Sequence, residues 1–145
     1  MAATIEDITE FLAKVPLFKE LSDRHLRRIA KRIRERDYEA DEVIVEQGQA
    51  GIGLYIMVRG EAIVKRQLLD GTEREVDRLH RTDFFGELSL LDEAPRTASV
   101  IAAENVKCLA LLKLDFLEEL DREPEMAIEM LKEMARRYRR MMARI

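Results

Sequence analysis

The chain has 145 residues, of which 47% are hydrophobic and 37% charged, a balance typical of one folded domain and not of a disordered segment. Its formal net charge of -4 gives nucleic acid no overall electrostatic attraction, and its single cysteine, Cys108, excludes an intrachain disulfide or a multi-cysteine metal site. No apolar run reaches the roughly 20 residues that span a bilayer. Because the acidic N-terminus lacks the features of a signal peptide, we expect a cytoplasmic location.

Residues 1–37 are predicted to be helical. Thr4 is placed to cap a first helix, with Asp7 three positions on, in the pattern of a capping box. Pro16 ends this helix, and Ser22 begins a second one whose apolar side chains recur at helical spacing. These side chains are Leu26, Ile29, Ala30 and Ile33.

Residues 38–112 have a different pattern, in which short apolar runs are separated by glycines. Such runs indicate the strands of a small antiparallel sandwich or barrel. Arg59-Gly60 and Asp70-Gly71 each stand between two strand-like runs, as hairpin turns do. The expected strands are residues 43–45, 54–58, 62–64, 99–102 and 106–112.

Residues 113–145 are predicted to be helical again. Asp115 can cap a short helix over residues 116–120, and Pro124 begins a long helix that runs to the last residue, at a position where the missing N–H of proline costs nothing. The fold class is therefore α+β. We expect one domain over residues 1–145 that is mainly β, built as an antiparallel, jelly-roll-like β-roll with N-terminal helices and a long C-terminal helix.

One segment, residues 84–100, carries residue types suited to a phosphate and a sugar. Gly86, followed by a short helical turn, lets backbone N–H groups approach an anion. Arg96 offers a fork of donors that suits a phosphate, and Glu87 is an acceptor that suits a sugar hydroxyl. One ligand with both groups explains this combination, whereas the simpler alternative is an ordinary ion pair between Glu87 and Arg96 beside a turn.

This segment resembles the phosphate-binding cassette of the cyclic nucleotide-binding domain family, whose pattern is F-G-E-x-[AS]-L, a spacer, then R-[ATS]-A-x-V. The resemblance extends over nearly the whole chain. It includes Val15-Pro16-Leu17-Phe18, residues 48–58, Gly60-Glu61, and the places of Phe116 and Pro124. It implies a β-roll with a short cassette helix that binds cAMP or cGMP as its ligand and needs no other cofactor.

The resemblance also implies residue roles. The backbone N–H groups of Gly86, Leu88 and Ser89 would bind the cyclic phosphate. Arg96 would form an ion pair with the same phosphate. Glu87 would accept from the ribose 2′-hydroxyl. The remaining ligand-binding positions are Thr97 and Ala98 beside the phosphate and base, and the lid positions over the base are Tyr138, Met141 and Met142.

Three positions bear on ligand choice and loop geometry. In kinase-type members of the family, Ala at the position of Thr97 goes with cAMP and Thr with cGMP, but other cAMP-binding members carry Ser or Thr there. The choice between cAMP and cGMP therefore stays open. Thr82 stands where the family often has glycine and Ile52 where it often has Asp; both lie outside the expected ligand contacts and bear on loop geometry.

The last helix has an apolar seam at the spacing of a heptad repeat, which predicts a homodimer through this helix. A second apolar stripe, at Ala127, Met130, Met134 and Met141, lies beside the seam, and the alternative is that both stripes pack on the chain's own roll. The seam consists of Ile128, Leu131, Ala135, Tyr138, Met142 and Ile145.

No Ser/His/Asp or Cys/His arrangement is evident, because His25 lies among arginines and His80 among polar residues. We therefore expect no catalysis and no metal. The leading interpretation is a sensor that relays ligand occupancy through its last helix to an unknown effector protein, without direct DNA binding. Two alternatives stay open: a regulatory-domain fragment of a larger regulator, channel or kinase, and a degenerate scaffold of the same fold that dimerises without binding nucleotide.

Overall fold

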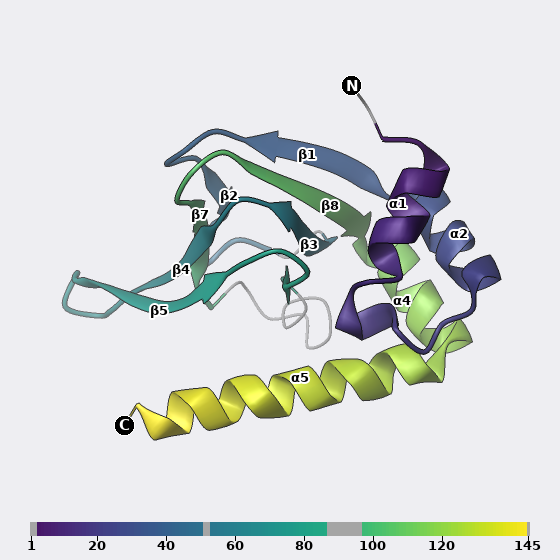
Figure 1. Cartoon of the computed structure of the whole chain (residues 1–145). Helices are drawn as coiled ribbons and strands as arrows, with labels where there is room; N and C mark the ends of the chain where they lie inside the picture. Colours follow the sequence, from purple (N-terminus) through teal and green to yellow (C-terminus); the bar gives the residue numbers. More distant parts are fainter. Residues whose placement is uncertain (1–2, 51–52, 87–96, 145) are drawn as a thin grey trace. The chain divides into compact units, whose positions relative to one another are not determined.

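The structure is a computed structural model that describes residues 3–50, 53–86 and 97–144 (Figure 1). These residues form two compact units. The helical unit combines residues 1–32 with residues 117–145, and the β unit consists of residues 33–116. Helices flank two antiparallel sheets along the chain, which confirms the predicted α+β class.

The helical unit brings the two ends of the chain together. Asp7 N–H donates to Thr4 Oγ1 at 3.1 Å and Thr4 N–H donates to Asp7 Oδ2 at 3.1 Å, which confirms the capping box. Pro124 begins the last helix, as predicted. The helices are α1 (Ile5–Leu12), the 3-10 turn η1 (Pro16–Phe18), α2 (Asp23–Arg32), α4 (Lys113–Arg122, which begins in the β unit) and α5 (Pro124–Ala143).

Helix α4 begins three residues earlier than the sequence indicated. Asp115 was expected to cap the helix, but it lies within the first turn. A carboxylate is also favourable there, because the first turn carries the positive end of the helix dipole. In the described part of the chain, no helix is long and apolar enough to cross a lipid bilayer.

The β unit holds two four-stranded antiparallel sheets, ordered β1-β8-β3-β6 and β2-β7-β4-β5. The expected strands at residues 99–102 and 106–112 have the predicted bounds. The strands are β1 (Arg34–Tyr38), β2 (Val43–Val45), β3 (Gly53–Arg59), β4 (Ala62–Gln67), β5 (Glu73–Leu79), β6 (Phe84–Phe85), β7 (Ser99–Ala102) and β8 (Val106–Leu112).

The predicted boundary between N-terminal helices and roll at residues 37 and 38 is wrong. Residues 34–38 form β1, which pairs with β8 from Arg34↔Ala110 to Tyr38↔Val106. The charged run before Tyr38 lacks the apolar alternation that marks a strand, because β1 is an edge strand with mostly exposed side chains.

The two predicted hairpins have different outcomes. Asp70-Gly71 does join two paired strands, β4 and β5. Gly60 instead connects β3 to β4, which belong to different sheets, so it lies at a corner of the roll. Its φ is +87°, and a Cβ built on it would overlap the backbone oxygen of Asn105. Both constraints require glycine at this corner.

The core of the β unit lies between the two sheets and contains residues of both. Cys108 is fully buried there, with its Sγ 3.7 Å from Met57 Sδ. Burial raises the pKa of the Cys108 thiol to about 12, and burial likewise raises the pKa of Tyr38 to about 12. The side chain of Cys108 therefore acts as a small neutral core residue.

Candidate functional site

The structure describes both ends of the cassette, residues 84–100, within the β unit. The upstream end is β6 with Gly86, and the downstream end is Thr97 and Ala98 leading into β7. Four of the predicted ligand contacts lie outside the described residues: Glu87, Leu88, Ser89 and Arg96. Their contacts with ligand stay predictions.

The upstream end is anchored by a short strand and an aromatic pair. Strand β6 pairs with β3 at Tyr55↔Phe85 and Ile56↔Phe84. The rings of Tyr55 and Phe85 stack, with centroids 5.0 Å apart and an interplanar angle of 8°. Both rings are buried, so this stacked pair supports the pairing of β6 with β3 at the start of the cassette.

Gly86 follows this strand directly and has a φ of +93°. This is the left-handed region, where a side chain with a Cβ is strained. The sequence argument assigned Gly86 to close approach of an anion, and the backbone conformation gives a second reason for glycine. The conformation turns the chain out of β6 at the first predicted ligand contact.

The downstream end is held on two sides. Strand β7 pairs with β2 and with β4, including Lys65↔Ser99 and Val64↔Val100. Gln47 N–H also donates to Ser99 Oγ at 2.8 Å. Thr97 is exposed and Ala98 is half-buried just before this strand. The two residues are thus available to a ligand while the strand after them is fixed.

The turn before β6 contains Thr82, a position at which the sequence differs from the resembling family. Thr82 has a φ of +74°, in the region that favours glycine, and it stands where the resembling family often has glycine. Threonine in place of glycine therefore introduces backbone strain next to the cassette.

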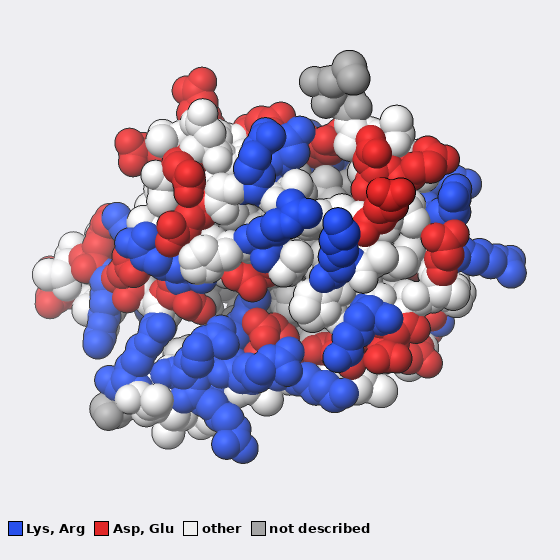
Figure 2. Space-filling model, viewed as in Figure 1, with Lys and Arg blue, Asp and Glu red and all other residues white. Residues whose placement is uncertain are grey.

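The predicted lid residues lie on α5, in the helical unit. Tyr138, Met141 and Met142 are 62%, 54% and 51% exposed, so their side chains are available to another molecule. Their role over the base of a ligand stays a prediction. Lysine and arginine side chains also gather along this helix (Figure 2). Glu133 is the only acid from Lys132 to Arg144.

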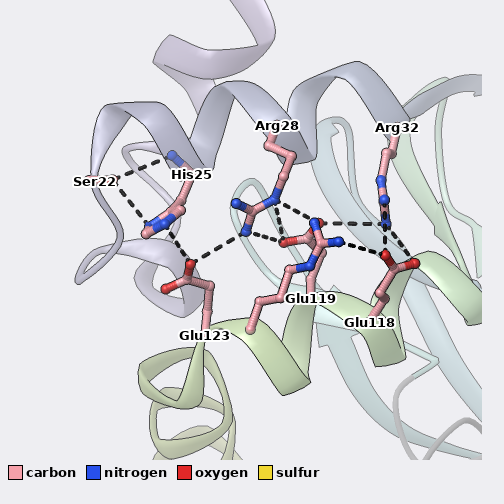
Figure 3. A network of polar contacts seen from close by, with 8 residues as sticks. Ser22, His25, Arg28, Arg32, Glu118, Glu119 and Glu123 are labelled. Atoms are coloured by element: carbon pink, nitrogen blue, oxygen red, sulfur yellow. Dashed lines mark hydrogen bonds and ion pairs between the residues drawn. The ribbon is translucent and has the colours of Figure 1, made fainter.

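A network of charged side chains joins α2 to α4 within the helical unit (Figure 3). Arg28 Nη2 donates to Glu119 Oε2 at 2.8 Å and lies 3.4 Å from Glu123 Oε1. His25 Nε2 lies 2.8 Å from that same Glu123 oxygen. The hydrogen bonds to Glu119 raise the pKa of Arg28. Glu119 is fully buried, so the network compensates a buried charge.

The outer part of this network is more exposed. Arg32 donates to both carboxylate oxygens of Glu118 at 3.3 Å, and these bonds lower the pKa of Glu118. Arg122 Nη2 donates to Glu118 Oε1 at 3.0 Å. Sequence reasoning missed the network, although a basic α2 and an acidic α4 were a signal of complementary charge. Among the described residues, no group of three or more His, Cys, Asp or Glu side chains could hold a metal ion.

Comparison with known proteins adds names to this geometry. The family profile described as cyclic nucleotide-binding domain matches residues 35–123, from within β1 to the residue that follows α4. The cAMP-dependent protein kinase regulatory subunit of Mucor circinelloides f. lusitanicus is 39% identical over 106 residues, covering 73% of this chain and 25% of that protein. The cyclic AMP receptor protein of Thermus thermophilus is 36% identical over 124 residues, covering 86% of this chain and 57% of that protein.

A solved structure shows the same fold. The regulatory subunit of a cAMP-independent protein kinase A from Trypanosoma brucei aligns with a TM-score of 0.82 and 26% sequence identity, over 91% of this chain and 47% of that chain. The chain thus spans between a quarter and somewhat over half of the length of these three proteins.

Proposed function

Because the chain belongs to the cyclic nucleotide-binding domain family, we propose that it is a sensor that binds cAMP or cGMP at its cassette and passes ligand occupancy on through α5. The observation that carries the proposal is the position of the two ends of the cassette. Gly86 has the left-handed φ of +93° directly after the anchored strand β6, and Thr97 stands exposed directly before β7. A ligand between these two ends would meet the predicted donors and acceptors of the cassette.

The chemistry assigned to the cassette suits one ligand class. Arg96 would pair with the negative cyclic phosphate, and Glu87 would accept from the ribose 2′-hydroxyl. The cassette would do no chemistry on the ligand, because opening a phosphodiester needs a base or metal with a positioned water. The cytoplasm is the compartment in which such a sensor would meet its ligand.

Titration calorimetry of the 145-residue chain with cAMP, cGMP and 5′-AMP tests the proposal. We expect a cyclic nucleotide to bind more tightly than 5′-AMP. Arg96→Ala should weaken binding at least tenfold, since charge-assisted hydrogen bonds contribute about 1.5–3 kcal/mol. Arg74→Ala, which removes the same charge from an exposed position on β5, should leave binding unchanged. Equal binding by the two variants would refute the cassette assignment.

Glu87 has its own test. Glu87→Ala should weaken binding less than Arg96→Ala, because a single ribose hydrogen bond is lost. A 2′-deoxy ligand should then show little further loss with this variant. If the losses from the variant and from the 2′-deoxy ligand simply add, Glu87 does not contact the ribose.

The choice of purine rests on Thr97. Its hydroxyl, exposed at the downstream end of the cassette, could bind a guanine amino group. Thr97→Ala should therefore lower the affinity for cGMP more than that for cAMP. An equal effect on both ligands would remove Thr97 from purine selection.

A second candidate function is a dimerising scaffold that binds no cyclic nucleotide. Two observations favour it: the structural neighbour from Trypanosoma brucei is described as cAMP-independent, and α5 exposes Ile128, Leu131 and Tyr138 at heptad spacing. Absence of calorimetric heat and of any thermal shift with either nucleotide would select this candidate, because a bound ligand stabilises the folded state.

The route to an effector would run along α5 in either case. The apolar seam offers a surface for a second copy, and the neighbouring cations offer a surface for an acidic partner. The proteins that the chain resembles are longer than it, so the effector could equally be a further part of the same polypeptide.

A further inference from the structure

The turn at residues 80–83 leads from β5 into β6, and so into the cassette. Asp83 N–H donates to His80 O at 2.9 Å, and His80 N–H donates to Asp83 Oδ2 at 2.8 Å, so the turn is closed on both sides. Thr82 has a φ of +74°, whereas Arg81 is not among the described residues with positive φ. This combination matches a type II β-turn, whose third residue is normally glycine.

Threonine is a poor residue for this position. Its Cβ carries two heavy atoms, and a left-handed backbone brings Cβ close to the carbonyl oxygen. Within the described part of the chain, no hydrogen bond of the Thr82 hydroxyl offsets this strain. A β-branched residue at positive φ is uncommon and stays there only when its surroundings hold it.

Two backbone hydrogen bonds hold Thr82 and its neighbour Asp83 to Met57. Thr82 N–H donates to Met57 O at 2.8 Å, and Met57 N–H donates to Asp83 O at 2.8 Å. These bonds continue the pairing of β6 with β3, which spans only two residues at the edge of the sheet. A return of Thr82 to negative φ would move both partners of Met57, so the strain directly opposes this pairing.

We propose that Thr82 is a positioning residue for the cassette, whose strain releases β6 from β3 in a substantial fraction of ligand-free molecules and so lowers the affinity for cyclic nucleotide. Gly86 follows β6 directly, so a released strand displaces the first ligand contact. The measured affinity then falls by the fraction of molecules that are competent to bind. This inference rests on the proposed function. It assigns Thr82 the effect of lowering the affinity at a position where glycine would be unstrained.

The test compares Thr82→Gly with Asp41→Gly. Asp41 is the other described non-glycine residue with positive φ, at +73°, and it lies in the turn between β1 and β2 of the same unit. Both substitutions remove left-handed strain, but only Thr82 leads into the cassette. Thr82→Ala, which removes the β-branch and keeps Cβ, should fall between wild type and Thr82→Gly.

Without nucleotide, amide hydrogen exchange at Met57 and at position 82 should slow about threefold in Thr82→Gly, because a tenfold shift of the pairing equilibrium, about 1.4 kcal/mol, divides between the change in exchange and the change in affinity. The dissociation constant for the preferred cyclic nucleotide should fall about threefold or more. Asp41→Gly should change neither quantity at these sites, although it raises the melting temperature.

Unchanged exchange at Met57 in Thr82→Gly would overturn the inference. Slower exchange with an unchanged dissociation constant would also overturn it, because Thr82 would then act on stability alone. If wild type binds neither cyclic nucleotide, the proposed function fails and the claim about affinity fails with it. The exchange comparison would still decide whether Thr82 weakens the pairing of β6 with β3.

Discussion

Arg28 donates two hydrogen bonds to the carboxylate of Glu119, from Nε to Oε1 at 3.2 Å and from Nη2 to Oε2 at 2.8 Å. The two residues are 91 positions apart, so this pair joins the first and last parts of the chain into one helical unit. Glu119 is fully buried, whereas Arg28 is partly exposed. The carboxylate of this ion pair is therefore buried, and losing its partner should cost as much as in a buried ion pair.

The first prediction is that Arg28→Met strongly destabilises the protein. Among the described residues, it leaves the buried carboxylate of Glu119 with Arg32, at 3.6 Å, as the remaining cation. Breaking a buried pair on one side costs about 3–5 kcal/mol, and Arg32 should keep the loss near the lower end. Urea unfolding measures it. Arg28→Met combined with Glu119→Leu should recover much of the loss, because the fully buried carboxylate is then gone and Glu123 keeps its contact with His25 at 2.8 Å.

Arg27→Ala is the matched control. Arg27 is on the same helix and pairs with Asp23 at 3.1 Å and Glu6 at 3.7 Å, but both partners are exposed. Its removal should cost about 0–1 kcal/mol. Equal losses for Arg27→Ala and Arg28→Met would show that the burial of Glu119 is unimportant.

The helical elements were predictable because their signals are local. The capping box at Thr4 and the proline at the start of α5 act within a few residues, and both were placed correctly. The Arg28–Glu119 pair was missed, since no local pattern shows which carboxylate a distant arginine will meet.

The sheets were predictable only in part, for a related reason. The strand at residues 106–112 is apolar and buried, so its pattern was clear, whereas the charged edge strand β1 owes its place to pairing with β8. Gly60 was recognised as a turn, but only the distant partners of β3 and β4 show that it lies between sheets. At the cassette, the sequence identified Gly86 and noted Thr82, while the left-handed φ of both came from the structure.

The second prediction separates backbone strain from close approach. Gly60 and Gly71 have nearly equal φ values, +87° and +88°, so replacement by alanine should strain both alike, by about 1–2 kcal/mol. Only Gly60 faces the Asn105 backbone oxygen, whereas nothing lies within 4 Å of a Cβ on Gly71. Gly60→Ala should therefore be clearly more destabilising in urea unfolding. Similar losses would mean that the corner yields to the added methyl group.

The third prediction concerns alkaline pH. Burial raises the pKa of Cys108 from 9.0 to about 12 and that of Tyr38 from 10.0 to about 12. Because the unfolded chain loses these protons at lower pH than the folded chain, their contribution to stability is complete below about pH 9 and is lost as the pH rises toward 12. Urea midpoints from pH 8 to pH 11 should show this decline.

Cys108→Ala and thiol reactivity provide the control. The variant should decline less steeply between pH 9 and pH 11, although it is less stable at pH 8 because it leaves a small cavity. In wild type the thiol should react with a disulfide reagent at pH 8 only as fast as the protein unfolds, since the side chain is fully buried. Rapid reaction in native conditions would contradict this burial.

The last prediction is a parallel homodimer through α5. Ile128, Leu131, Tyr138 and Met142 are each more than half exposed and occupy a or d positions of a heptad repeat. If Ile128 is an a position, Lys132 and Arg139 are e positions, and Ala127 and Met134 are g positions. A parallel pair sets each e cation against an apolar g residue of the other copy, which its methylene stem can cover. An antiparallel pair instead sets the e cations of the two copies against each other, so charge favours the parallel arrangement.

Sedimentation and cross-linking test both the dimer and its direction. Wild type at about 100 μM should sediment as a dimer, and Leu131→Glu with Tyr138→Glu should sediment as a monomer. In a Cys108→Ala background, Met142→Cys should form covalent dimers on oxidation, because equivalent a positions face each other only in a parallel pair. Arg136→Cys, which lies on the outer side of the helix, should cross-link much less. A wild-type monomer with and without cyclic nucleotide would rule out the dimer, and sedimentation as a dimer without the Met142→Cys cross-link would rule out the parallel direction.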